Sequence, residues 1–446
     1  MKNKKKMALF LVVALCLQVT GCGKAVSEVG TNQIAGAIIS AEYPEMAKYP
    51  DTNGWEYDKE EYVAWRASRA AQEPENTEYQ DGMKEFYLAT IPAFLDGDDG
   101  GNRIYSPLNI YMALAMLAET TAGESRNQIL KLLHTDSIES LRVKSKTLWN
   151  ANYCDDGTVT SLLASSVWLS DTLQYNKAVL ETLADTYYAS SFSGEMGSVE
   201  LNKSLRDWLN ANTGDLLKEQ TVGVGFNPLT IFALATTVNF KAKWAEEFKP
   251  SKTAEDTFYA VSGELTCEFM KQSDTDRYYW GENFSAVVRR LENSGNMILI
   301  LPDEGIMAEA LLNDAETLEF MLNYRNWENS KTLTINQAIP KFDVVSDIDF
   351  RKILKTLGVT DVLTMENANF TPITMEPGVY LQEAKHATRV MIDEEGCQAA
   401  AYTVLEACGS SMPPEEKIDF VLNRPFLFVL NGQDGQPLFI GIVNQP

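Results

Sequence analysis

The chain has 446 residues, of which 45% are apolar and 22% are charged, and its formal net charge is −24. This composition is ordinary for a globular protein and excludes a largely disordered chain. The negative charge disfavours nucleic acid and anionic lipid as partners, and no cluster of Lys or Arg beyond the N-terminus suggests a heparin-like site. Length alone suggests two or three domains.

The first 22 residues have the pattern of a bacterial export signal. Four lysines precede an apolar run at residues 8–17, which is shorter than the roughly 20 residues that span a bilayer. Residues 19–22 (VTGC) resemble a lipobox, in which cleavage leaves the cysteine as a lipidated N-terminus. We therefore expect a signal peptide at 1–21, a lipid on Cys22, and a location outside the cytoplasmic membrane at the cell surface. Ordinary signal cleavage, with Cys22 incidental, is the alternative.

The expected processing changes both the charge and the cysteine count. The signal holds four lysines and no other charged residue, so its removal takes the formal charge from −24 to −28. The spacing of the cysteines beyond the signal and Cys22 fits no zinc motif, and the chain has only two histidines. We expect no cofactor, no metal held through histidine and no disulfide framework, although a carboxylate calcium site stays open. These cysteines are Cys154, Cys267, Cys397 and Cys408.

The N-terminal part of the mature chain shows no sustained periodicity. Several prolines interrupt residues 23–77, which predicts a tether over 22–78 with one short helix near 59–71. We expect the compact domain to cover 79–446.

Helices in this domain are indicated by their ends. Ser106 and Pro107 have the types preferred at the N-cap and first helical position, and the residues up to Gly123 are apolar on most sides. This pattern predicts a buried helix. Helical spacing over 201–209 and over 350–357 predicts two further helices that rest on a core.

Strands are predicted at 230–240, 296–301 and 379–392. Two further apolar segments, 426–430 and 438–443, flank the turn-rich sequence NGQDGQ and predict a hairpin. Helices and strands occur in runs without strict alternation, which favours the α+β class.

Several segments, taken together and in order, resemble the serpin family. They are NRIYSPLN (102–109), LNKSLRDWLNANTGDLL (201–217), TTVNFKAKW (236–244), IPKF (339–342), LG (357–358), NRPFLF (423–428) and PLFIG (437–441). The resemblance implies one large α+β domain with three β-sheets, about nine helices and an exposed reactive-centre loop, in place of the two or three domains that length suggests.

The resemblance places this loop at about residues 394–414. The segment that matches the family's hinge consists of Glu394, Glu395, Gly396 and Cys397, followed by Ala399, Ala400 and Ala401. If Cys397 faces inward as the chain enters a sheet, then every second residue up to position 407 shares its face. These residues are small or apolar, and Thr403 is the only polar one. The pattern permits full insertion as a strand.

Counting fourteen residues from Gly396, as in the family, places the cleaved bond between Ser410 and Ser411. The residues before it are the small Ala407, Cys408 and Gly409, and Met412 follows it. Small residues suit proteases with shallow primary pockets, of the elastase or subtilisin kind, and disfavour trypsin-like proteases. Cleavage one or two residues away, for instance after Met412, is the alternative.

The family's mechanism implies that this chain is not an enzyme but a monomeric suicide substrate of an extracellular serine protease, with cysteine proteases as a second target class. The protease would be held as a covalent acyl complex while the loop inserts into the central sheet. By the same resemblance, Trp244 matches the breach, where insertion begins, and Ser106 and His386 match the shutter. Departures from the family pattern are Cys397 in place of Thr or Ser, Thr236 in place of Asn, and Asn109 in place of Ser.

Three other functions remain as alternatives. A cysteine hydrolase would need Cys397 or Cys408 beside His386 as a base. A solute-binding lipoprotein would fit the signal, but it predicts a βαβ alternation that the chain lacks. A non-inhibitory serpin, serving as a carrier or scaffold, often carries proline or charge at the inserting positions, and this chain carries neither there.

Overall fold

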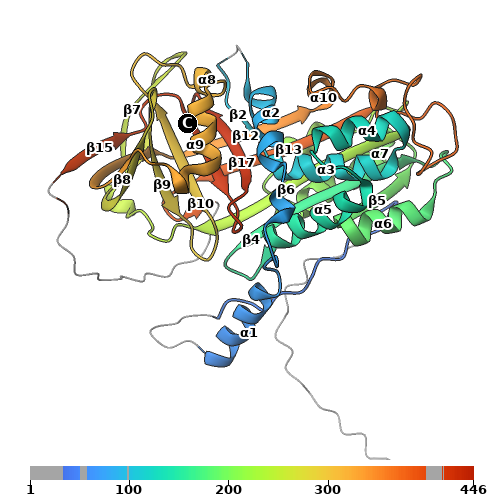
Figure 1. Ribbon diagram of the computed structural model, residues 1–446, viewed down its shortest axis with the longest axis horizontal. Helices are drawn as coiled ribbons and strands as arrows, with labels where there is room; N and C mark the ends of the chain where they lie inside the picture. Colours follow the sequence, from blue (N-terminus) through green and yellow to red (C-terminus); the bar gives the residue numbers. More distant parts are fainter. Residues whose placement is uncertain (1–33, 51–57, 98–99, 398–413, 415) are drawn as a thin grey trace, which may run out of the picture. The chain divides into compact units, whose positions relative to one another are not determined.

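The computed structural model describes residues 34–50, 58–97, 100–397, 414 and 416–446. Within them, residues from Ile34 onward form one unit that contains ten α-helices and two hydrogen-bonded sheets (Figure 1). The helices are α1 (Lys59–Ala70), α2 (Met83–Leu95), α3 (Pro107–Thr120), α4 (Gly123–Leu132), α5 (Ile138–Asn152), α6 (Lys177–Tyr187), α7 (Val199–Ala211), α8 (Ala308–Leu311), α9 (Ala315–Asn323) and α10 (Arg351–Thr356). None of the helices in these ranges is long and apolar enough to cross a bilayer.

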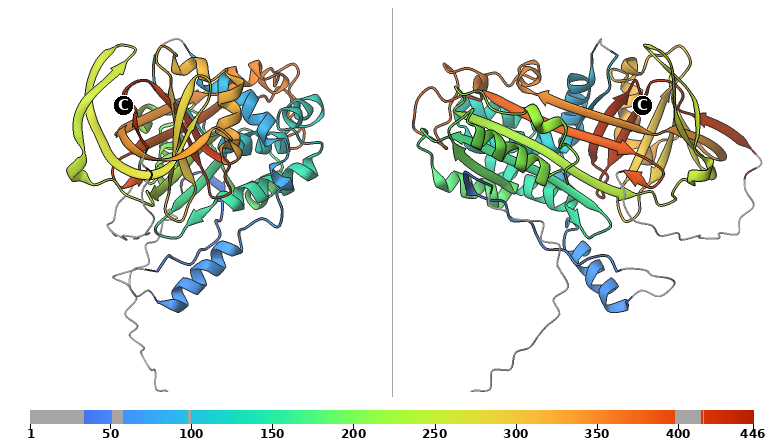
Figure 2. Two further views of the ribbon diagram at one scale, coloured as in Figure 1. Left: turned by 60° about the vertical axis from the view of Figure 1, so that its left-hand side comes forward. Right: turned by 180° about the vertical axis from the view of Figure 1, so that it is seen from behind.

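The first sheet, sheet A, contains the long strands on which the candidate site is built. In spatial order it comprises β1 (Ala37–Ile39), β5 (Ala189–Gly194), β4 (Thr160–Ser170), β6 (Phe232–Lys243), β14 (Gly396–Cys397), β13 (Glu383–Ile392) and β12 (Phe342–Asp349), with β3 (Cys154–Asp155) paired to β4. Viewed from behind, β6 and β13 run beside each other through the middle of the sheet (Figure 2).

The second sheet, sheet B, holds the remaining strands. In order it comprises β15 (Lys417–Val421), β11 (Ser330–Pro340), β8 (Gly263–Trp280), β9 (Phe284–Arg290), β10 (Asn296–Pro302), β16 (Phe426–Asn431), β17 (Pro437–Val443) and β2 (Arg103–Tyr105), with β7 (Ala254–Ala260) paired to β8. The long strands β8 and β11 pair along eleven residues. This pairing connects strands that would belong to two separate sheets in an arrangement of three sheets. The predicted α+β class is confirmed, but the strands of the described residues form two hydrogen-bonded sheets and not the three that the resemblance implied.

The buried helix predicted from Ser106 and Pro107 is confirmed as α3. The Ser106 hydroxyl accepts a hydrogen bond from the Asn109 backbone N–H, which satisfies one of the free donors of the first turn. All fourteen residues of α3 are buried, because the helix lies between sheet A and the other helices. A helix that is apolar on most sides is stable only in such a place.

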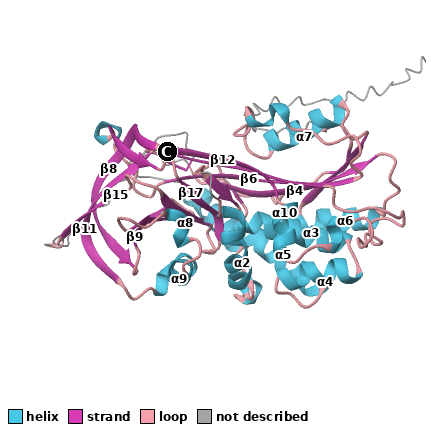
Figure 3. Cartoon of the chain, turned by 90° about the horizontal axis from the view of Figure 1, so that it is seen from above, coloured by secondary structure: helices cyan, strands magenta, loops and turns pink. Residues whose placement is uncertain are grey.

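Sheet A is covered differently on its two faces. Helix α7 lies on one face, and α3, α5 and α6 lie on the other (Figure 3). The predicted helical spacing over 201–209 is confirmed in α7, which buries Leu201, Leu205, Trp208 and Leu209 against a small apolar cluster on the strands. The large core lies on the opposite face, around α3. Along β6, residues alternate between these two environments, as the pleat of a strand requires.

The C-terminal hairpin is confirmed as β16 and β17, which pair antiparallel from Phe426↔Val443 to Asn431↔Pro437. The predicted strands at 230–240, 296–301 and 379–392 correspond to β6, β10 and β13, and the helix predicted over 350–357 is α10. Their ends differ from the predictions by a few residues, because local propensity defines strand ends poorly.

Residues 34–50 and 58–78 do not behave as a free tether. Strand β1 pairs with the edge strand β5, and the Tyr43 ring stacks on Trp149 at a centroid distance of 5.6 Å. The predicted helix near 59–71 is confirmed as α1, whose Trp65 indole N–H donates to Asp156 over 2.9 Å. The aromatic contacts come from irregularly spaced residues, so no periodic pattern indicated them.

Candidate functional site

The central feature of sheet A is a seam between β6 and β13. These strands pair in parallel from Glu383↔Ala233 to Ala387↔Thr237, whereas β4 and β12 pair antiparallel on their outer sides. Parallel pairing is slightly less stable per residue than antiparallel pairing. The seam is thus a short parallel ladder of five residue pairs between two antiparallel ones.

Beyond the paired part of the seam, β14 lies between the two strands. Gly396 and Cys397 pair antiparallel with Lys243 and Ala242 of β6. On its other side, Cys397 pairs with Ile392 of β13. The strands thus form a fork that is closed at Thr237 and Ala387 and is held open by the two-residue strand β14.

The turn that leads into β14 is stabilised by Asp393. Its Oδ1 accepts hydrogen bonds from the backbone N–H groups of Glu395 (2.9 Å) and Gly396 (3.2 Å), which is the usual way in which an Asp side chain stabilises a turn. A Cβ atom on Gly396 would lie 2.3 Å from the Ala242 carbonyl oxygen. Only glycine permits this close approach of two backbones.

Glu394 is held by an ion pair and a hydrogen bond. Its carboxylate lies 3.0 Å from Lys341 Nζ and accepts a hydrogen bond from the Thr253 hydroxyl over 2.7 Å. Burial raises the pKa of the Glu394 carboxyl, but the hydrogen bonds from Thr253 and Lys341 outweigh it and hold this pKa below its usual value. Lys341 also contacts Glu268 at 3.1 Å, so the hinge is tied to β8.

Trp244 lies at the end of β6, next to the turn. Its indole N–H donates to the Asp393 carbonyl (2.9 Å) and its backbone N–H donates to the Glu395 carbonyl (2.9 Å). The Arg289 guanidinium lies 5.4 Å from the centre of the Trp244 ring, within cation–π range. Trp244 therefore supports the point from which the inserted segment starts.

The other end of the fork is marked by His386, which is completely buried. The Ser106 backbone N–H donates to His386 Nε2 over 3.0 Å, and His386 Nδ1 lies 3.0 Å from the Thr236 hydroxyl oxygen. Because Nε2 accepts a hydrogen bond, the ring proton belongs on Nδ1 and is donated to Thr236. Burial lowers the pKa of His386 to about 3, so the ring is neutral at ordinary pH.

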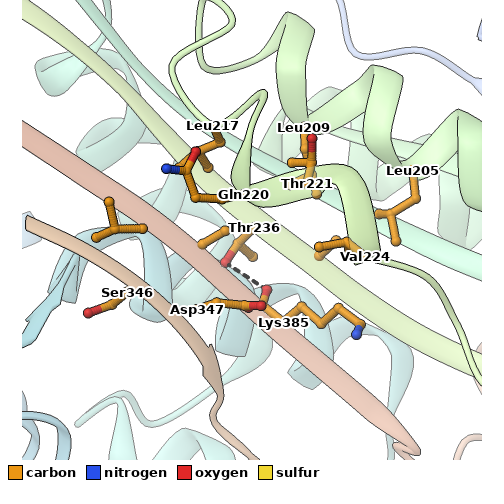
Figure 4. Close-up of a pocket in the computed structure, with 13 residues that line it drawn as sticks. Leu205, Leu209, Leu217, Gln220, Thr221, Val224, Thr236, Ser346, Asp347 and Lys385 are labelled. Carbon is orange, nitrogen blue, oxygen red and sulfur yellow. Dashed lines mark hydrogen bonds between the residues drawn. The ribbon is translucent and has the colours of Figure 1, made fainter.

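The segment that follows α7, called the cover below, crosses the seam on the α7 face of sheet A. The Arg389 guanidinium donates to the Leu216 carbonyl over 2.7 Å and is paired with Asp343 at 2.5 Å, which attaches the segment after α7 to β12 and β13. A cavity of about 20 Å³, enough for a single water molecule, lies between this cover and the strands. Figure 4 shows Leu205, Leu209 and Val224 above it and Thr236 and Lys385 below it.

The structure thus brings Ser106 and His386 into contact and places Trp244 beside the hinge. Trp244 is about 26 Å along β6 from the row of Thr236 and His386. Cys397 is buried on the core side of the sheet, together with Ala242 and Ile392. Cys22, Ala399, Ala400, Ala401, Ala407, Cys408, Gly409, Ser410, Ser411 and Met412 lie outside the described residues.

Sequence reasoning did not assign Asp393, Thr253 or Lys341 to the site. A signal for Lys341 was present, since it is the basic residue of the IPKF segment, but nothing in that segment identifies Glu394 as its partner. The cysteine-hydrolase alternative is wrong for Cys397, which lies six rows of the sheet from His386. Burial also raises the pKa of the Cys397 thiol well above its usual value, which disfavours the reactive thiolate.

The described residues form a large α+β domain in which the hinge lies between two parallel strands of sheet A. Comparison with known proteins identifies the family that this arrangement belongs to. The family model described as "Serpin (serine protease inhibitor)" matches residues 81–446. This chain belongs to the serpin family, whose members are generally protease inhibitors and not enzymes.

Three relatives illustrate the similarity. Alpha-1-antiproteinase of Callosciurus caniceps is 28% identical over 359 residues, covering 77% of this chain and 83% of the relative. Leukocyte elastase inhibitor of Homo sapiens is 25% identical over 372 residues, covering 81% and 97%. The native structure of tengpin, a thermophilic serpin, superposes with a TM-score of 0.74 at 24% identity, covering 84% of this chain and 96% of that one.

Proposed function

We propose that this protein is an extracellular inhibitor of serine proteases that acts as a suicide substrate. The observation that carries the proposal is the fork in sheet A, where Gly396 and Cys397 already occupy the first two positions of an inserted strand. The residues that follow are small or apolar on the inward side, which permits the strand to continue between β6 and β13. Resemblance to inhibitory relatives supports the same function.

The covalent step follows ordinary acyl transfer. The oxygen of the protease serine attacks the Ser410 carbonyl carbon and forms an ester, while the bond between Ser410 and the nitrogen of Ser411 breaks and the new amine leaves with a proton. A cysteine protease would form a thioester in the same way. The chain up to Ser410 is then free of the chain from Ser411 onward.

Insertion follows from the freedom of the new end. Fourteen residues of strand measure roughly 46 Å at about 3.3 Å per residue, so a protease attached at Ser410 is drawn along sheet A by that distance. Each new backbone hydrogen bond contributes about 0.5–1.5 kcal/mol. Distortion of the protease's oxyanion hole then stops deacylation, because hydrolysis needs the donors of that hole in place.

The small residues before the proposed bond favour elastase-like or subtilisin-like targets, since shallow primary pockets accept them. One relative bears the name leukocyte elastase inhibitor, which supports an elastase as the first protease to test. The chain from residue 23 onward, which keeps the whole described unit, is mixed with neutrophil elastase and run on a denaturing gel, and the released peptide is sequenced.

We expect a complex that survives boiling and a peptide that begins at Ser411. The matched control is Ala401→Arg, which places a charge on the inward face of the inserting strand and is expected to be cleaved without trapping the protease. A peptide that begins after Met412 moves the bond but keeps the mechanism. Cleavage of the unchanged protein with no complex, and with no gain in stability afterwards, means a non-inhibitory carrier or scaffold.

The proposal includes attachment to the bacterial membrane through a lipid on Cys22, which rests on the lipobox-like residues 19–22. Labelling of growing cells with radioactive palmitate tests it. The full-length chain should incorporate label and the Cys22→Ser variant should not. Equal labelling of both, or of neither, refutes the lipid anchor.

A further inference from the structure

A groove with a volume of about 1020 Å³ runs along the outward face of α5. Its opposite wall consists of residues 44–46 and of residues 68–78, which include the end of α1. The α5 wall is formed by residues that recur every three or four positions, so they lie on one helical face and cover about 15 Å of its length. These residues are Ser140, Val143, Thr147 and Asn150.

The wall opposite α5 is fixed by contacts with the rest of the unit. The Tyr153 hydroxyl donates to the Pro44 carbonyl over 3.1 Å. Arg69, near the end of α1, is buried and donates to Cys154 Sγ over 2.6 Å and to the Asn293 carbonyl over 3.0 Å. The groove is therefore preformed, and a preformed site avoids the cost of ordering its walls when a partner binds.

Exposed carboxylates surround this groove without counter-ions. Six of the lining residues are acidic and exposed, and none of them forms an ion pair within the ranges that the structure describes. Among the described lining residues, Lys144 is the only lysine or arginine, and its ammonium group donates to the Asp81 carbonyl and lies 5.5 Å from the centre of the Tyr111 ring. The groove is thus complementary to a cationic partner. The six acidic residues are Glu45, Glu73, Glu75, Glu78, Asp81 and Asp136.

Apolar side chains lie among these carboxylates. Val143 is 71% exposed on the α5 wall, and Met46, Ala71 and Pro74 belong to the opposite wall. Lysine and arginine side chains bury their aliphatic stems on apolar surface while their charged ends reach towards water or a counter-ion. A groove that combines apolar and acidic side chains therefore fits both parts of these residues.

We propose that this groove docks a Lys- and Arg-rich segment of a partner protein in an extended conformation. About five residues of extended chain cover the length of the α5 wall. Their stems pack on Val143 and Met46, and their charged ends pair with the surrounding carboxylates. Nucleic acid and anionic membranes are repelled by the same charge. The inference goes beyond the proposed inhibition, because the groove contains neither the hinge nor the seam of sheet A.

The test measures binding of fluorescein-labelled hexa-arginine to the chain from residue 23 onward by fluorescence anisotropy, at low and at physiological salt. The variant Val143→Trp fills the groove without changing the charge of the protein. Its matched control is Val199→Trp, since Val199 is 76% exposed on α7 and does not line the groove. Val143 and Val199 are both on helix surfaces, so both variants should keep the unfolding midpoint of the unchanged protein.

A second pair of variants tests the charge of the groove. Glu73→Gln combined with Glu75→Gln removes two charges from the groove. Glu255→Gln combined with Glu264→Gln removes two charges from the exposed hairpin of β7 and β8. The two double variants have the same net charge, so a difference between them reports on the place of the charges.

We expect the probe to bind the unchanged protein more weakly as the salt concentration rises, because salt screens exposed charges. Val143→Trp should weaken binding about tenfold, since a side chain of the protein then occupies the space of the segment. The double variant of Glu73 and Glu75 should weaken it about fivefold, the effect of losing two partly exposed ion pairs. Both controls should stay within about twofold of the unchanged protein.

Absence of saturable binding, equal affinities of Val143→Trp and Val199→Trp, or equal losses in the two double variants overturns this assignment. Failure of the proposed inhibition gives a different result, since it appears on the denaturing gel with elastase and leaves the binding of hexa-arginine unchanged.

Discussion

His386 makes this protein sensitive to acid in a defined pH window. The imidazole is completely buried, with the Ser106 backbone N–H on one nitrogen and Thr236 on the other. Its folded pKa is about 3, whereas an exposed histidine has a pKa near 6.5. Between these values the unfolded chain binds a proton that the folded chain cannot bind, so stability falls as the pH falls from about 6.5 towards 3.

The size of the effect follows from the shift. Each pH unit well inside this window costs about 1.4 kcal/mol. The unfolded histidine is already half protonated at pH 6.5, so the change from pH 6.5 to pH 4.5 costs about 2.3 kcal/mol through His386 alone. The variant His386→Gln keeps an acceptor and a donor but cannot titrate. We expect it to be less stable than the unchanged protein at pH 7, and to lose most of this disadvantage at pH 4.5.

The assay is urea unfolding of both proteins at pH 7.0 and pH 4.5, followed by tryptophan fluorescence. The comparison of the two proteins removes the contribution of the carboxylates, which titrate in both. A stability difference between the variant and the unchanged protein that is the same at the two pH values would refute the reasoning. It would mean that His386 is protonated in the folded state or that the shutter opens before it titrates.

Three further changes have expected outcomes. Arg142→Met removes a bidentate partner from the buried Glu119, and because Arg142 is partly exposed we expect a loss of about 2 kcal/mol in urea unfolding; no loss would show that the pair contributes nothing. Gly396→Val places side-chain atoms against the Ala242 carbonyl, so under the proposed mechanism the denaturing gel with elastase should show more cleaved protein and less complex, and an unchanged ratio would contradict the fork. Trp65→Phe removes the hydrogen bond to Asp156, and limited proteolysis should release the N-terminal segment about tenfold faster for a loss of about 1.4 kcal/mol; an equal rate would show that α1 is held by other contacts.

The elements that the sequence predicted share one property: their signals lie in neighbouring residues. Ser106 and Pro107 define the start of α3 because capping is a contact between residues three apart. The hairpin of β16 and β17 follows from one short turn-rich segment. The alternation expected for residues 397–407 rests on the two-residue period of a strand, and beyond Cys397 it lies outside the described residues and stays a prediction. These features need no knowledge of the rest of the chain.

The tertiary structure decided which distant residues meet. His386 and Thr236 are 150 positions apart, and their pairing depends on the register of two parallel strands that long connections separate. Glu394 forms an ion pair with Lys341, and Tyr43 stacks on Trp149, only because the sheets and helices pack in one arrangement. A local pattern contains no information on such a register, since sliding one strand by two residues keeps every side chain on its face while changing every partner. The sequence by itself thus determined the family and the hinge segment, and packing decided which distant residues hold that hinge and surround His386.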